Sequence, residues 1–151
     1  MAQLGESVET IEELQSGGQA IRRILVVDDN HVNQLVATKM LEALGYACET
    51  VDSGQECMAA LSQEDYTLVF MDVEMPGLTG PEVTEQIRAK KGRNSAVPII
   101  GLTAATSAAD NRRCLNSGMN TVVTKPFRRE DIAKVLARYL PRGASQEDKA
   151  R

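Results

Sequence analysis

The sequence predicts an α/β fold, a doubly wound parallel sheet of five strands with five helices. Three observations predict it. Short aliphatic runs alternate with segments whose apolar residues recur at helical spacing. Polar or turn-forming residues follow each run, as at the end of a buried strand. The 151 residues, 42% of them hydrophobic, suffice for one domain, and its core is aliphatic because aromatic residues make up only 3%.

Five segments have the length and the apolar character of strands. The third is an uninterrupted apolar run, and Met75-Pro76-Gly77 then forces a loop. Because a helical segment stands between each strand and the next, the pattern is typical of parallel strands with helices on both faces of the sheet. The predicted strands are Arg23–Val27, Ala47–Val51, Leu68–Met71, Pro98–Leu102 and Thr121–Thr124.

Helix signals fill the stretches between these strands. Ser53 with Glu56 three residues later has the capping-box pattern, and Pro81 suits a first helical turn. The predicted helices cover residues 30–44, 53–61, 81–90 and 107–116, and a fifth carries Ile132 to Tyr139 and ends at Pro141. The first helix is expected to bury one face, formed by Val36, Ala37, Met40, Leu41 and Leu44.

The two ends of the chain differ from the predicted domain, residues 21–140. Residues 1–20 are polar and acidic, with only a weak helical pattern between Val8 and Leu14, and are predicted to be a flexible leader. Residues 141–151 are charged and are expected to be a disordered tail. No output domain is expected after the last predicted helix, because this tail is short.

Composition excludes several classes of function. The net charge of −4 argues against a large nucleic-acid footprint. No apolar run resembles a signal peptide or is long enough to span a bilayer, so a soluble cytoplasmic protein is the expectation. The three cysteines lack CxxC spacing, which favours reduced thiols over a metal or redox site.

Chemically useful side chains follow four of the predicted strands. Asp28 and Asp29 follow the first strand, Asp72 the third, Thr103 the fourth and Lys125 the fifth. The carboxyl ends of strands in an open α/β sheet form the usual ligand site, so these groups are expected to meet at one edge. The acid pair, the single acid, the hydroxyl and the amine would then form one constellation of side chains at this edge.

Together these motifs resemble the receiver domain of two-component response regulators, over about residues 22–140. The motifs that carry the resemblance are Asp28-Asp29-Asn30, Met71-Asp72-Val73-Glu74-Met75-Pro76-Gly77 with Gly80, Thr103-Ala104, and Lys125-Pro126-Phe127. His31-Val32-Asn33 and Gly118-Met119-Asn120 make the chain most similar to receivers of hybrid histidine kinases. The resemblance implies a flavodoxin-like strand order, 2-1-3-4-5.

The resemblance also implies a reaction, transfer of a phosphoryl group from a phosphohistidine to Asp72. In that family match, Asp29 and Asp72 ligate Mg²⁺ directly and the backbone carbonyl of Glu74 adds a ligand. Asp28 acts mainly through water. A carboxylate can attack phosphorus once the surrounding negative charge is neutralised, so the chemistry agrees with these roles.

Two further roles come from the same resemblance. Lys125 contacts the acceptor and the incoming phosphoryl group, and a cis Lys125-Pro126 bond is implied. Thr103 offers a hydroxyl to the phosphoryl oxygens. Receivers often carry an aromatic residue three positions before the lysine, but this chain has Val122 there. The usual aromatic switch is therefore expected to be absent or replaced.

The implied donor is a histidine kinase or a histidine-phosphotransfer protein. His31, Val32 and Leu35 are expected to form a patch that docks a partner helix. The chain is not expected to be an enzyme beyond its own phosphorylation and slow dephosphorylation. Two alternatives stay open: a Mg²⁺-dependent phosphohydrolase of the haloacid dehalogenase type, with Glu74 as acid/base, and a pseudo-receiver that binds partners without phosphorylation.

Overall fold

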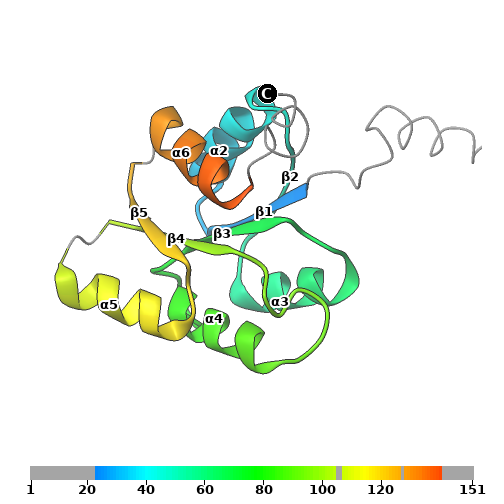
Figure 1. Ribbon diagram of the computed structural model, residues 1–151, viewed down its shortest axis with the longest axis vertical. Helices are drawn as coiled ribbons and strands as arrows, with labels where there is room; N and C mark the ends of the chain where they lie inside the picture. The colour runs from blue at the N-terminus through cyan, green and yellow to red at the C-terminus, as the bar shows by residue number, and fades with distance from the viewer. Residues whose placement is uncertain (1–22, 105–106, 127, 141–151) are drawn as a thin grey trace, which may run out of the picture.

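The computed structural model describes residues 23–104, 107–126 and 128–140 (Figure 1). Its centre is a five-stranded parallel sheet with the order β2-β1-β3-β4-β5, so the predicted fold class and strand order are confirmed. The strands are β1 (Arg23–Val27), β2 (Ala47–Val51), β3 (Leu68–Asp72), β4 (Ile99–Thr103) and β5 (Thr121–Thr124). The predicted leader and tail lie outside the described residues.

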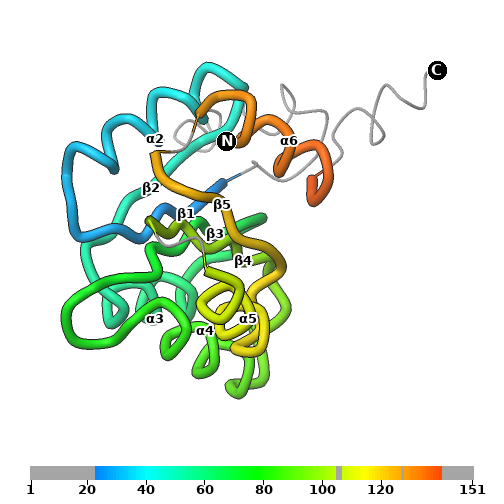
Figure 2. Tube along the Cα trace, turned by 90° about the vertical axis from the view of Figure 1, so that its left-hand side faces the viewer, coloured from blue at the N-terminus to red at the C-terminus, as the bar shows by residue number. Residues whose placement is uncertain are grey.

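Five helices among the described residues cover the two faces of this sheet. They are α2 (His31–Ala43), α3 (Gly54–Gln63), α4 (Gly80–Ala89), α5 (Ala108–Ser117) and α6 (Arg129–Tyr139). Figures 1 and 2 show α2 and α6 on one face and α3, α4 and α5 on the other. None of the described helices has both the length and the apolar character needed to cross a membrane.

The core consists of two largely aliphatic layers, one on each face of the sheet. Alternate side chains of a strand point to opposite faces, so Ile24 and Val26 pack under α2 and α6 while Leu25 and Val27 pack under α3 and α4. All five residues of β3 are buried, as expected of a central parallel strand. This rigid strand carries Asp72 at its last position.

Local sequence signals set most helix boundaries. The Asn30 side chain accepts hydrogen bonds from the amides of Val32 and Asn33, which fixes the start of α2. Before α3, Ser53 accepts from the amide of Glu56, but the Glu56 carboxylate bonds the amide of Asp52 at 2.8 Å. Of the two hydrogen bonds that define the predicted capping box, therefore, only the one from the Glu56 amide to Ser53 forms.

The predicted buried face of the first helix is wrong at one position. Val36 is 40% exposed, whereas Gln34 is buried together with Ala37 and Leu41. These three residues share the i, i+3, i+7 spacing of one helix face. The polar Gln34 occupies the inner position because it finds hydrogen-bond partners there, as the site shows.

Candidate functional site

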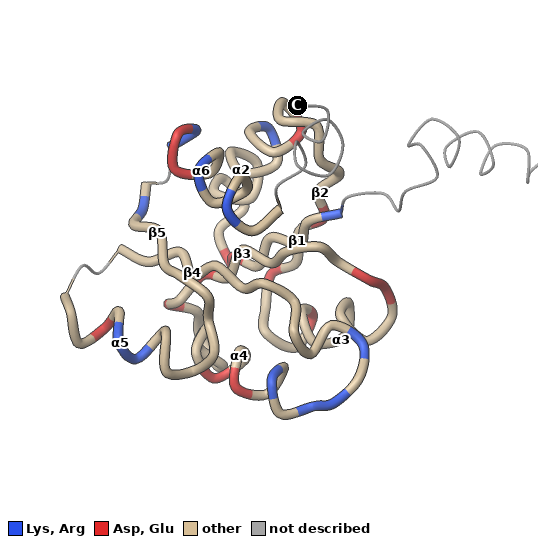
Figure 3. Tube along the Cα trace, viewed as in Figure 1, with Lys and Arg blue, Asp and Glu red and all other residues tan. Residues whose placement is uncertain are grey.

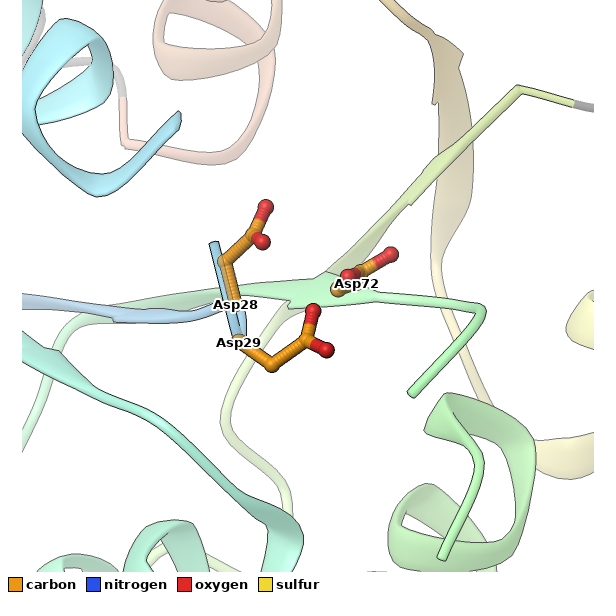
Figure 4. A group of neighbouring side chains, drawn as sticks. All are labelled: Asp28, Asp29 and Asp72. Carbon is orange, nitrogen blue, oxygen red and sulfur yellow. The ribbon is translucent and has the colours of Figure 1, made fainter. Parts of the chain in front are cut away.

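Three carboxylates meet at the carboxyl edge of the sheet. Asp28 and Asp29 follow β1, and Asp72 ends β3, the strand next to it. One oxygen from each lies within 4.8 Å of the others, and Figure 4 shows the Asp29 carboxylate directed toward Asp72. Asp28 and Asp72 are only 1% and 2% exposed, while Asp29 is exposed. Carboxylates this close and this buried need a cation.

Lys125 supplies one positive charge from the end of β5. Its Nζ lies 3.0 Å from Asp72 Oδ1 and 3.6 Å from Asp28 Oδ2. The Lys125 amide donates to the carbonyl of Thr103 at 2.7 Å, which continues the β4–β5 pairing up to the lysine. The Lys125-Pro126 bond is cis, as expected. One ammonium against three carboxylates leaves an excess of negative charge that a divalent cation would neutralise.

The buried Asp28 is held by neighbouring amides. Its Oδ1 accepts from the Asn30 amide at 2.9 Å, and its Oδ2 accepts from Asn33 Nδ2 at 3.2 Å. Gln34 Nε2 donates to the Asp28 carbonyl at 2.7 Å and to Asp52 Oδ1 at 2.7 Å. Sequence reasoning missed Gln34, although its helical spacing with the buried Ala37 and Leu41 was a usable signal.

Thr103 and Glu74 meet beside the Asp72 carboxylate. Thr103 is 2% exposed at the end of β4, and its hydroxyl donates to Glu74 Oε2 at 3.2 Å. The Glu74 amide donates to Asp72 Oδ1 at 3.2 Å. The loop after β3 thus holds the Asp72 carboxylate through its backbone and the Thr103 hydroxyl through a side chain.

The surroundings change the acidity of Asp72 and Lys125. Burial of the Asp72 carboxyl, reinforced by the charge of Asp28, raises its pKa to about 6, although the Lys125 hydrogen bond and the Glu74 amide act the other way. Burial lowers the pKa of Lys125, but its hydrogen bond to Asp72 and the nearby carboxylates outweigh burial and raise it. Near pH 7 an anionic Asp72 therefore faces a cationic Lys125.

This raised pKa predicts how metal-free stability depends on pH. Folded Asp72 binds its proton more tightly than the ordinary value of 3.8 allows, so its contribution to stability is complete below pH 4 and is lost as the pH rises through 6. From pH 4 to 7.5 this group should lower the free energy of unfolding by about 2–3 kcal/mol. Urea unfolding in a chelator at several pH values measures it. Asp72→Asn should lack this component, and an identical pH dependence in the variant would contradict the assignment.

The expected docking residues lie on the exposed side of α2, in its first turns. Val32 is 68% exposed and Leu35 is 57% exposed. The exposed His31 places Nε2 3.3 Å from the Asp52 carboxylate.

Val122, in β5, is half-buried and packs against the core cluster of α3, α4 and α5. Aliphatic packing thus occupies the position of the usual aromatic switch.

Comparison with known proteins assigns a family to this arrangement. A sequence model of the response regulator receiver domain matches residues 24–137. The sensor protein GacS of Pseudomonas syringae pv. syringae is 41% identical over 119 residues, which are 78% of this chain and 13% of that protein. The chain thus spans about an eighth of this curated relative.

Solved structures agree. The receiver domain of the sensor histidine kinase PA1611 from Pseudomonas aeruginosa PAO1, with magnesium coordinated in its active-site cleft, is 38% identical with a TM-score of 0.74, over 81% of this chain and 99% of that one. A co-crystal structure of Saccharomyces cerevisiae Ypd1, a histidine phosphotransfer protein, with the Ssk1 receiver domain also matches. The identity is 30% and the TM-score 0.71, over 79% of this chain and 88% of that one. With its sheet order and its strand-end acids, this chain belongs to the response regulator receiver family.

Proposed function

We propose that the protein is a phosphorelay receiver that accepts a phosphoryl group from a phosphohistidine onto Asp72 and thereby switches partner binding. The observation that carries the proposal is the environment of Asp72. Its carboxylate is buried, ends a central strand, lies 3.0 Å from the Lys125 ammonium and belongs to a three-carboxylate cluster. A capping or structural aspartate needs no such arrangement, whereas an anionic nucleophile for phosphorus does.

The donor set of this cluster fits Mg²⁺. The cluster offers hard carboxylate oxygens, and the exposed Asp29 leaves solvent access for metal-bound water. We assign Asp29, Asp72 and the backbone carbonyl of Glu74 as direct ligands and Asp28 as a ligand through water. When bound, the ion neutralises the charge of the acceptor and of the phosphoryl oxygens. The magnesium in the PA1611 receiver supports this assignment.

The transfer is a displacement at phosphorus. An Asp72 carboxylate oxygen attacks, the bond from phosphorus to the donor imidazole breaks, and its electron pair stays on the departing nitrogen. Lys125, 3.0 Å from Asp72, balances charge on the acyl phosphate that forms. The Thr103 hydroxyl leaves Glu74, 3.2 Å away, to donate to a phosphoryl oxygen. That exchange of hydrogen-bond partners at the end of β4 is the proposed switch.

We propose that the donor helix docks on His31, Val32 and Leu35, in the first two turns of α2 after the acid pair. Two exposed aliphatic side chains this close to a polar site suit a helix that must bring a histidine to Asp72. The Ypd1 co-crystal structure supports a phosphotransfer protein as one such donor. The free thiols of Cys48, Cys57 and Cys114 suit a reducing compartment, and we place the reaction in the cytoplasm.

Magnesium should stabilise the folded chain through these acids. A ligand that binds only the native state stabilises it by RT ln(1 + [L]/Kd), about 2.7 kcal/mol at a hundred times Kd. Thermal unfolding in excess Mg²⁺ should therefore occur several degrees higher than in a chelator. Asp29→Asn should abolish most of that shift, whereas Asp65→Asn, at an exposed loop residue, should retain it. An unchanged shift in Asp29→Asn would remove Asp29 from the ligand set.

The function is tested by labelling. The full chain is mixed with Mg²⁺ and a phosphohistidine-bearing donor carrying ³²P, and labelled chain is treated with hydroxylamine, which cleaves acyl phosphates. We expect label that requires Mg²⁺ and is released by hydroxylamine. A phosphohydrolase of the dehalogenase type would instead turn over small phosphate esters continuously. A pseudo-receiver would take up no label.

A further inference from the structure

A second binding feature lies far from Asp72, between α3 and α4. A pocket of about 160 Å³ opens there, large enough for aliphatic side chains, with a floor formed by Met58, Leu61 and Ile87. Ser62 completes the α3 side of its wall. Such an apolar hollow between two helices is a ready site for a side chain from another segment.

The rim of this pocket is basic. Lys90, Lys91 and Arg93 line it from the end of α4 and the loop that follows, where Lys and Arg gather below α3 in Figure 3. Arg93 lies 3.6 Å from the exposed Asp65, a weak surface pair. Within the part of the chain that the structure describes, no ion pair engages Lys90 or Lys91. A bound segment with an apolar face bordered by acidic side chains would match the apolar floor and the basic rim of this pocket.

The start of the chain has that composition. Residues 1–20 contain four glutamates and no lysine or arginine. Leu4, Val8, Ile11 and Leu14 follow one another at spacings of four, three and three, so a helix over residues 4–14 would put them on one face. The glutamates are Glu6, Glu9, Glu12 and Glu13. The sequence is therefore complementary to the pocket in polarity and in charge.

The described chain begins beside this pocket. The Arg23 guanidinium bonds the Glu64 carboxylate at the end of α3. The neighbouring Gln63 carbonyl accepts from Arg93 Nη1 at 3.0 Å, so the first described residue and the pocket rim meet at one helix end. The nine-residue step from Leu14 to Arg23 reaches up to about 30 Å when extended. The acidic segment can thus fold back onto the pocket of its own chain.

We propose that residues 4–14 dock as an amphipathic helix in the pocket between α3 and α4, with the side chain of Ile11 on the apolar floor. Glu12, the glutamate that borders the apolar face of such a helix, then lies nearest to the basic rim of Lys90, Lys91 and Arg93. Local tethering through a short linker favours this occupant over a free peptide, because the linker raises its effective concentration at the pocket. The contact is distinct from the phosphoryl site and from the α2 docking patch.

The first test compares two leader variants of the full ¹⁵N-labelled chain by NMR. Ile11→Asp removes the apolar contact, and Thr10→Asp adds the same charge one position away, on another side of the helix. The amide signals of Leu61, Ser62 and Ile87 should move in Ile11→Asp and stay nearly in place in Thr10→Asp. Identical spectra at these residues in both variants would overturn the proposal. Both substitutions lie outside the domain, so folding is not at issue.

The second test reverses the charge of the basic rim. Lys90→Glu with Lys91→Glu should expose the segment to a glutamate-specific protease and speed cleavage after Glu12 about tenfold, which corresponds to a loss of 1.4 kcal/mol. Lys39→Glu with Lys134→Glu, at exposed lysines of other helices, should leave the rate unchanged. Equal rates for the two double variants would overturn the proposal. Protection that disappears on dilution would assign the occupant to a second copy and overturn the intramolecular contact.

Discussion

Replacing Asp72 by Asn should lower phosphoryl transfer to the chain by at least about 10³-fold, since loss of a nucleophile costs an enzyme that much or more. An amide has no anionic oxygen with which to attack phosphorus. Its carbonyl can still accept from Lys125 Nζ and from the Glu74 amide, the two partners of Asp72 Oδ1 in the wild type. The variant should therefore fold normally and fail in chemistry alone.

The measurement is the initial rate of ³²P uptake from a phosphohistidine donor in excess Mg²⁺. Asp65→Asn is the matched control, because it makes the same change at an exposed aspartate outside the cluster, and its rate should stay within about twofold of the wild type. Equal labelling of wild type and Asp72→Asn would show that another residue is the acceptor. His31, the only histidine in the chain, would then be the first residue to test.

In the same variant, the free energy of unfolding should rise while the rate of phosphoryl transfer falls. The Asp72 charge is buried beside Asp28, and burial is the main reason that its pKa is raised. In a chelator at pH 7.5, Asp72→Asn removes this buried charge, so the free energy of unfolding should rise even as transfer is lost. A variant that is more stable but inactive distinguishes loss of the nucleophile from loss of the fold.

The sequence predicted well which residues meet at the carboxyl edge of the sheet, because the common direction of parallel strands determines where each strand ends. Once alternating strands and helices indicate parallel pairing, every strand ends at the same edge, and residues as distant as Asp29 and Lys125 must converge there. The prediction needed no side-chain geometry. The structure adds the distances, with 3.0 Å between Lys125 and Asp72 as the shortest link between the basic and acidic groups.

What the sequence could not supply were contacts between side chains from separate segments. Apolarity placed Val36 inside, but Gln34 is buried because its amide meets the Asp28 carbonyl and the Asp52 carboxylate, groups on two different loops. The bond from Thr103 to Glu74 has the same origin, since it joins the ends of β3 and β4. The spacing of apolar residues indicates which helix face is buried. It does not identify the hydrogen-bond partner that the fold places beside a polar residue.

Replacing Gly80 by Ala should destabilise the protein by about 3 kcal/mol, at the upper end of the usual cost of overpacking. Gly80 is the first residue of α4, after the Thr79 cap, where Ala would ordinarily help a helix. A Cβ at Gly80, however, would lie 2.5 Å from the Asp72 carbonyl oxygen and 2.9 Å from the Val73 Cα. Backbone cannot rotate away as a side chain can, so the loop after β3 must shift.

Gly77→Ala is the matched control in the same loop. A Cβ there meets nothing within 4 Å, but the residue has φ +82°, so Ala should cost only about 1 kcal/mol of left-handed strain. Urea unfolding of both variants should therefore rank Gly80→Ala as the less stable, despite its ordinary backbone angle. The shift should also slow phosphoryl uptake, because the displaced atoms belong to Asp72, the proposed acceptor. If Gly80→Ala were as stable as Gly77→Ala, the close packing of α4 against the backbone of Asp72 would not hold in solution.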